Sequence, residues 1–125
     1  MRQNILTLAC VALVAAFSVT VRAADLAGSW TSKFETQVGE QSYTFTFVSN
    51  GGKISGTAKS NLLGETKLTD LKVDGDKVTF VENATFMEMP LNITYSGTFS
   101  GADEIKFTRL VVADTPETFV AKRAK

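Results

Sequence analysis

The chain contains no histidine and a single cysteine, Cys10, which lies in an apolar N-terminal segment. Sites that need a histidine base, a cysteine nucleophile, or imidazole or thiolate metal ligands are therefore excluded from the rest of the chain. No disulfide can form there either, so stability must come from packing and backbone hydrogen bonds. Paired carboxylates remain, but Asp74 and Asp76 flank a hairpin glycine, where Asp is expected for backbone reasons. We accordingly predict no enzymatic activity, no metal site and no cofactor.

Charge is balanced and no basic stripe is present. The chain has 13 basic and 13 acidic residues, scattered singly along the sequence. Removal of residues 1–23, which include Arg2 and Arg22, reduces the 13 basic residues by two to 11 and leaves a net charge of −2. Nucleic-acid binding requires clustered Lys and Arg to neutralise phosphates, so this function is excluded.

Residues 1–23 have the pattern of a secretory signal peptide. Arg2 supplies a positive charge, residues 5–21 are largely apolar, and Val21-Arg22-Ala23 fits the small-residue rule before cleavage. The alternative, an uncleaved membrane anchor, would need about 20 apolar residues, and Thr and Ser dilute this segment. We expect cleavage after Ala23, a secreted or periplasmic location, no membrane span after cleavage, and one domain formed by residues 24–125.

Turn signals recur at nearly even spacing along residues 24–125, which is typical of an antiparallel all-β domain. The strongest are Asn50-Gly51-Gly52 and Asp74-Gly75-Asp76, whose residues tolerate the positive φ angles of tight hairpins. Between the turns apolar and polar residues alternate, as in residues 43–47, so each strand has one buried face. The pattern predicts eight strands, at about 28–36, 41–49, 53–60, 65–73, 77–84, 89–99, 104–111 and 117–123.

Two segments depart from regular alternation. Leu68 and Leu71 cannot share a face unless a β-bulge lies between them, and residues 83–89 are compatible with strand, bulge or loop. No segment has a helical period, although residues 60–65 could hold a single turn. Eight antiparallel strands joined by hairpins favour an up-and-down barrel, because closure removes the exposed edges of the sheet.

Residues near the two ends of the chain are expected to meet in this barrel. The first and last strands of an up-and-down barrel are neighbours, so Arg123 is expected over the indole of Trp30, a contact that contributes about 0.5–2 kcal/mol. Gly28 allows the chain to turn tightly beside that indole. We assign these three residues a structural role in closing one end. The alternative is that Trp30 is a core aromatic and Arg123 a solvated terminal residue.

The motif Gly28-Ser29-Trp30, together with the basic residue that ends the last strand, resembles the calycins, which are the lipocalins and their relatives. Residues 97–101 and 104–108 and the closing segment 119–123 are similar to small secreted bacterial barrel proteins of unassigned function. The resemblance implies a lipocalin-like barrel with a Trp at one end and a cation across its ring. Leu26 to Trp30 is also similar to the start of secreted bacterial metalloprotease inhibitors, small eight-stranded barrels that usually carry a disulfide.

Function depends on whether the barrel is filled or hollow, since eight strands leave room for side chains or for one small ligand. Small residues at inward positions, Gly56, Ala58, Gly97 and Ala121, open space and favour a cavity. Aromatic residues on the inward face are numerous enough to fill a short barrel. They are Phe34, Tyr43, Phe45, Phe47, Phe80, Tyr95, Phe99, Phe107 and Phe119.

A cavity would take its polar contacts from inward-facing residues near strand ends. The candidate ligand-binding residues are Tyr43, Phe45, Phe80, Glu82, Tyr95 and Arg109. The favoured alternative is that Glu82 and Arg109 lie at the rim in water or pair with each other. The leading hypothesis is non-catalytic binding of a small apolar or amphipathic molecule in the barrel. The second is a protein-interaction module, such as an inhibitor of an extracellular protease, that uses loops at Leu62-Leu63 and Phe86–Met89.

Overall fold

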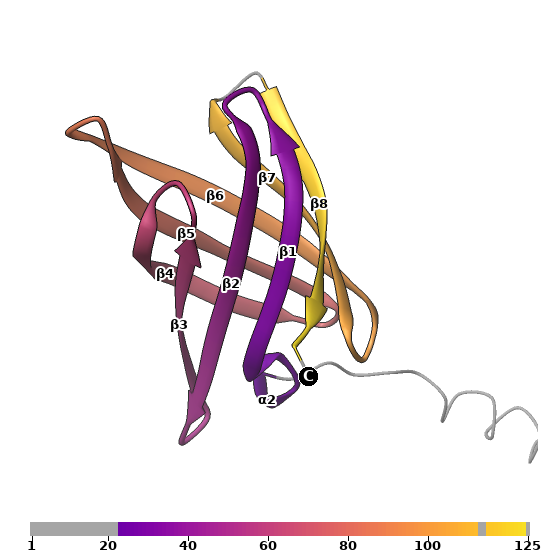
Figure 1. Cartoon of the computed structure of the whole chain (residues 1–125). Coiled ribbons are helices and arrows are strands. Elements are labelled where there is room, and N and C mark those ends of the chain that lie inside the picture. Colours follow the sequence, from indigo (N-terminus) through magenta and orange to yellow (C-terminus); the bar gives the residue numbers. More distant parts are fainter. Residues whose placement is uncertain (1–22, 113–114, 125) are drawn as a thin grey trace, which may run out of the picture.

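The computed structural model describes residues 23–112 and 115–124. The signal peptide predicted at residues 1–23 lies outside them, except for its last residue. Eight strands form a closed antiparallel barrel in which each strand pairs with the next and β8 returns to β1 (Figure 1). The elements are α2 (Ala23–Leu26), β1 (Gly28–Thr36), β2 (Gly39–Asn50), β3 (Lys53–Ser60), β4 (Gly64–Asp74), β5 (Lys77–Phe86), β6 (Met89–Gly101), β7 (Glu104–Val112) and β8 (Thr115–Arg123). The predicted fold, an all-β, eight-stranded, up-and-down barrel, is confirmed.

The irregular segments have local explanations. The predicted bulge in β4 is present: its register against β5 shifts between Thr69 and Lys72, and Asp70 has a φ of 54°. Residues 83–89 form the end of β5, a two-residue turn at Met87 and Glu88, and the start of β6. Residues 61–63 form a turn rather than a helix. The helix α2 was not predicted, because four residues are too few to show a helical period.

One end of the barrel is closed by α2 and the tryptophan below it. Trp30 is fully buried, and its indole Nε1 donates a hydrogen bond of 2.9 Å to the carbonyl oxygen of Leu26. The guanidinium carbon of Arg123 lies 4.3 Å from the centroid of the Trp30 ring. The predicted contact between the first and last strands is therefore confirmed.

Arg123 also ties the N-terminal segment to the last strand. Its Nη1 donates to the carbonyl oxygen of Ala27 at 2.9 Å, and its Nη2 donates to that of Asp25 at 2.7 Å. Gly28 has a φ of 120°, and a Cβ there would lie 3.1 Å from Nη1 of Arg123. Glycine at this position thus provides both the left-handed backbone and the room that the guanidinium occupies.

The seam between β1 and β8 has a short backbone ladder, which side-chain contacts extend. Within the described residues its ladder consists of two pairs, one of which joins Thr31 to Lys122. Farther along, the hydroxyl of Ser32 donates to the carbonyl oxygen of Val120 at 2.8 Å. The rings of Phe34 and Phe119 stack there with their centroids 4.3 Å apart.

Aromatic rings fill the middle of the barrel. Phe45 is fully buried and its ring centroid lies within 6.4 Å of those of six others. These are Tyr43, Phe47, Phe80, Tyr95, Phe107 and Phe119. Phe99, also expected inside, is half-buried and packs edge-on against Trp30 at the closed end, with a centroid distance of 5.9 Å.

The expectation that the inward glycines leave open space is wrong. A Cβ on Gly97 would lie 2.5 Å from the ring of Phe107, and one on Gly56 would lie 2.8 Å from the ring of Phe47. The space beside each glycine is therefore occupied by a phenylalanine from the neighbouring strand. The centre of the barrel is filled, not hollow.

We predict that Gly97→Ala destabilises the protein by about 1–3 kcal/mol, because the added methyl group overpacks the ring of Phe107. Gly101→Ala is the matched control, since a Cβ at Gly101 has no neighbouring atom within 4 Å and the change should be nearly neutral. Urea denaturation of the three proteins measures the difference. Equal stability of Gly97→Ala and the unsubstituted protein would show that the interior is loose enough to admit additional atoms.

Candidate functional site at the barrel mouth

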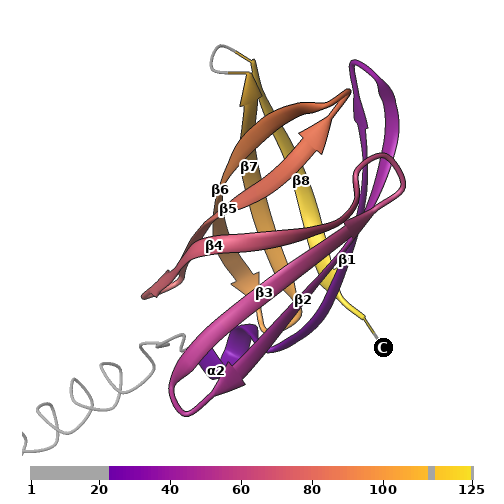
Figure 2. The same cartoon turned by 90° about the vertical axis from the view of Figure 1, so that its left-hand side faces the viewer.

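A pocket lies at the end of the barrel opposite α2. The hairpins β1–β2, β3–β4 and β5–β6 all turn at this end, while α2 precedes β1 at the other (Figure 2). We call the open end the mouth. The pocket there has a volume of about 160 Å³. Its lining residues are Thr36, Gln37, Val38, Gln41, Leu62, Leu63, Phe86, Leu91, Ile93, Arg109, Val111, Thr115 and Glu117.

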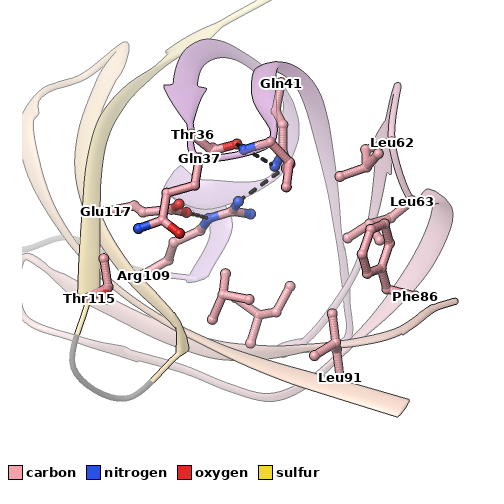
Figure 3. A pocket seen from close by; sticks show the side chains of 13 residues that line it. Thr36, Gln37, Gln41, Leu62, Leu63, Phe86, Leu91, Arg109, Thr115 and Glu117 are labelled. Atoms are coloured by element: carbon pink, nitrogen blue, oxygen red, sulfur yellow. Dashed lines mark hydrogen bonds and ion pairs between the residues drawn. The ribbon is translucent and has the colours of Figure 1, made fainter. Parts of the chain in front are cut away.

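The two sides of the pocket differ in chemistry. Gln41, Arg109 and Glu117 form a polar side, whereas Leu63 and Phe86 stand on the apolar side facing it (Figure 3). The polar side comes from β2, β7 and β8, and the apolar side from the β3–β4 and β5–β6 hairpins. The pocket is therefore amphipathic across its width.

Arg109 anchors the polar side and is only 2% exposed. Glu117 is its cross-strand partner on β8, and its Oε1 accepts a hydrogen bond of 2.7 Å from Nε of Arg109. Nη2 of Arg109 donates to Oε1 of Gln41 at 3.3 Å, and Gln41 in turn donates to the hydroxyl of Thr36 at 3.2 Å. The guanidinium carbon also lies 4.7 Å from the ring centroid of Phe34. These contacts hold the guanidinium in one orientation.

A buried carboxylate lies beneath Arg109, connected to it through two tyrosines. Nη1 of Arg109 donates to the hydroxyls of Tyr43 and Tyr95, at 3.1 and 3.0 Å. Those hydroxyls donate to Oε1 of Glu82, at 3.0 and 2.6 Å, and Thr66 donates to its Oε2 at 2.7 Å. Glu82 has no exposed surface. Within the described residues, every buried side-chain nitrogen and oxygen has a hydrogen-bond partner.

The structure brings four of the six predicted ligand-binding residues into this network: Tyr43, Glu82, Tyr95 and Arg109. The other two, Phe45 and Phe80, pack among the core rings. Arg109 lines the pocket, and the other five lie beneath it.

The expectation that Glu82 and Arg109 lie at the rim in water is wrong. Both side chains are buried, because β5 and β7 continue past them to Phe86 and Val112 before the chain turns. They do not form the direct pair that was the other expectation: the tyrosine hydroxyls bridge them, and Arg109 forms its ion pair with Glu117.

Sequence reasoning missed three polar members of the site: Gln41, Thr66 and Glu117. The alternation of inward and outward side chains along a strand assigns each of these residues to the inward face. Gln41 has the same inward parity as Tyr43, and the burial pattern of β2 places both inside. The sequence assigned Leu63 and Phe86 to exposed loops and not to the pocket. Residues at hairpin tips do not follow the alternation of strands, so their orientation could not be predicted.

Burial and neighbouring charges shift the titration of the network. Burial is the main cause that raises the pKa of Tyr43 and, more strongly, that of Tyr95, and the charge on Glu82 raises both further. Burial alone would lower the pKa of Arg109, but its contacts with Tyr95 and Glu117 outweigh this and leave the pKa raised. At neutral pH the tyrosines are therefore protonated and Arg109 is charged.

Comparison of the chain with known protein-family models, curated proteins and solved structures found no significant match. Among the described residues, no group of three or more His, Cys, Asp and Glu is arranged to hold a metal ion. No helix in the described part of the chain is long and apolar enough to cross a membrane.

We predict that stability falls as the pH rises above about 10, the ordinary pKa of tyrosine. Unfolded tyrosines lose their protons there, whereas Tyr43 and Tyr95 keep theirs in the folded protein, so the unfolded chain binds fewer protons. Each tyrosine contributes stability that is complete below pH 10 and declines above it by at most about 1.4 kcal/mol per pH unit. Tyr95→Phe should reduce this slope.

The chain contains two tyrosines, so phenolate absorbance reports on this pair alone. Absorbance and circular dichroism followed together in an alkaline titration should change in one step, as the protein unfolds. Phenolate that forms near pH 10 while the chain stays folded would contradict the prediction.

Proposed function

We propose that the protein binds a small amphipathic molecule in the pocket at the barrel mouth and catalyses no reaction on it. The observation that carries the proposal is the arrangement of the lining, with Arg109 fixed on one side and Leu63 and Phe86 on the other. A concave, mainly apolar pocket with a few oriented polar groups is the usual form of a small-molecule site.

The filled core limits what can enter. The pocket, at about 160 Å³, is close in size to an apolar cavity of about 150 Å³ that binds benzene. The rings of Phe45, Phe107 and Phe119 occupy the space below, so the ligand cannot lie along the barrel axis. The enclosed part of the ligand is thus one ring or a short chain, and a longer tail would leave through the mouth.

The polar end of the ligand is expected to be an anion, and a carboxylate fits best. A guanidinium presents parallel N–H groups that match the two oxygens of a carboxylate. Nε and Nη2 of Arg109 already contact Glu117 and Gln41, the latter at a long 3.3 Å. Because Glu117 is partly exposed, its carboxylate can turn into water and give its place to the ligand. The tyrosine contacts with Nη1 would hold the guanidinium in place meanwhile.

The proposal includes a secreted or periplasmic location and a lipocalin-like family. The N-terminal segment supports a secreted or periplasmic location, where the protein would meet small amphiphiles. The lipocalin-like assignment is supported by the eight-stranded closed topology and by the contact of Arg123 with Trp30.

We predict that hexanoate binds and that 1-hexanol, its uncharged counterpart, binds more weakly. Glu117→Gln removes the competing carboxylate and should strengthen hexanoate binding about fivefold without changing hexanol binding. Leu63→Trp fills the pocket and should abolish both. Leu110→Trp, on the exposed wall outside the pocket, is the matched control and should leave both unchanged. Calorimetry and chemical-shift changes in NMR spectra measure these effects.

Native mass spectrometry of the protein purified from the periplasm, compared with the denatured sample, tests for a natural ligand. A discrete additional mass that disappears on denaturation is expected, and its value would identify the ligand class. The proposal would be overturned if the native protein had only its ligand-free mass and if Leu63→Trp did not affect hexanoate binding.

A further inference from the structure

Exposed apolar side chains lie at three hairpins of the mouth. Met87 is 81% exposed and Val38 62%, and Leu62 and Met89 are exposed as well. We call these four residues the apolar rim. They come from three hairpins that turn at the same end of the barrel (Figure 2). They account for four of the seven large apolar residues that are exposed in the described part of the chain.

Among the described residues, the turns at the opposite end of the barrel contain no large apolar side chain. Its turns are Gly51-Gly52, Gly75-Asp76 and Ala102-Asp103, which are small or polar as hairpins usually require. The turns at the mouth instead contain Gln-Val, Asn-Leu-Leu and Met-Glu. Hairpin geometry therefore does not account for the apolar tips.

Charge also differs between the two ends. Among described residues within three positions of the mouth turns and of residues 113–114, there are five glutamates and one lysine, a sum of −4. They are Glu35, Glu40, Lys59, Glu65, Glu88 and Glu117. Near the opposite turns and the described chain ends, six basic residues stand against five acidic ones. Glu117 is paired with Arg109, which lines the same pocket, and Glu65 lies opposite Lys59, so the excess negative charge of the described part of the mouth is carried by Glu35, Glu40 and Glu88.

Two glutamates at the mouth face each other directly. Glu35 and Glu40 are cross-strand partners on either side of the Val38 turn, and both are exposed. Like charges placed opposite each other destabilise a sheet. A cation brought by a binding partner would relieve this repulsion.

The turn that displays Met87 is strained. Met87 has a φ of 52° and Glu88 a φ of 65°, so both have left-handed backbone. Two-residue hairpins of this type strongly prefer Asn-Gly. Left-handed backbone without glycine persists where the surrounding structure enforces it, and it is concentrated at functional sites. The strain coincides here with the most exposed apolar side chain of the rim.

We infer that the apolar rim docks a second protein, at a surface where apolar side chains are flanked by lysine or arginine. Apolar tips and an excess of negative charge occur together at the mouth and are complementary to such a surface. The inference goes beyond small-molecule binding, because Met87, Met89 and the acidic pair do not line the pocket.

The negative charge of the mouth favours this partner over two other candidates, an anionic membrane and a second copy of this chain. An anionic membrane surface would be repelled by the glutamates of the mouth, and a second copy of this chain would bring the same charges to the contact. A basic, apolar protein surface satisfies both features of the rim.

The experiment uses a random peptide library displayed on phage and selected on the whole protein. Peptides with Leu, Phe or Trp between Lys or Arg should be enriched. In the double variant Met87→Asn with Glu88→Gly, the affinity for a selected peptide should fall about tenfold. The same variant should melt about 5 °C higher, because the strain is relieved. A loss of binding in a more stable protein cannot be attributed to misfolding.

Matched variants separate the rim from general surface effects. Val38→Ser should weaken peptide binding, whereas Val48→Ser, at a 54% exposed valine near the opposite end, should not. Glu35→Gln with Glu40→Gln should weaken binding at low salt and reduce its dependence on ionic strength. Absence of basic and apolar enrichment, or equal affinity in the rim and control variants, would overturn the inference.

Two further outcomes would also overturn it. One is rim-dependent binding to vesicles of phosphatidylcholine and phosphatidylglycerol in a flotation assay, which would make the rim a lipid contact. The other is a dimer in sedimentation velocity that the Met87→Asn, Glu88→Gly variant dissolves, which would make the partner a second copy.

Discussion

The structure depends on a pair of opposite charges held inside an aromatic barrel. Glu82 and Arg109 are both buried, and burial of an ion costs several kcal/mol unless partners replace its water. Tyr43 and Tyr95 supply those partners, since each hydroxyl accepts from Arg109 and donates to Glu82. The network draws on β2, β5, β6 and β7, and a one-residue slip in any of them would turn its side chain outward. The network forms only in the observed strand register, and it therefore favours this register over shifted ones.

The same pair determines where the interior of the barrel is filled and where the pocket remains open. The tyrosine hydroxyls point to Glu82 on one side and to Arg109 on the other, with stacked rings packed around them. Below Arg109 the space is filled, and above it the pocket opens between polar and apolar sides. The guanidinium is thus both the end of the core network and the polar surface presented at the mouth.

Much of the fold could be predicted because alternation, turn residues and closure are local or topological properties. The bulge at Asp70 followed from the phase of Leu68 and Leu71, and the contact of Trp30 with Arg123 followed from barrel closure. The filled interior could not be predicted in this way. Parity places Gly97 inside the barrel, but whether the space beside it is empty or holds the Phe107 ring depends on a rotamer on another strand.

The two ends of the barrel differ in how well their local sequence agrees with the fold. At the closed end each local choice agrees with the fold: Gly28 has the left-handed backbone that suits glycine, and Arg123 satisfies carbonyl groups while covering Trp30. At the mouth the choices conflict, with left-handed Met87 and a facing pair of glutamates. Proteins violate local rules chiefly where function requires it, and the rest of the structure must compensate. The closed end and the packed aromatic core supply stability that can offset the strain and the facing glutamates of the mouth.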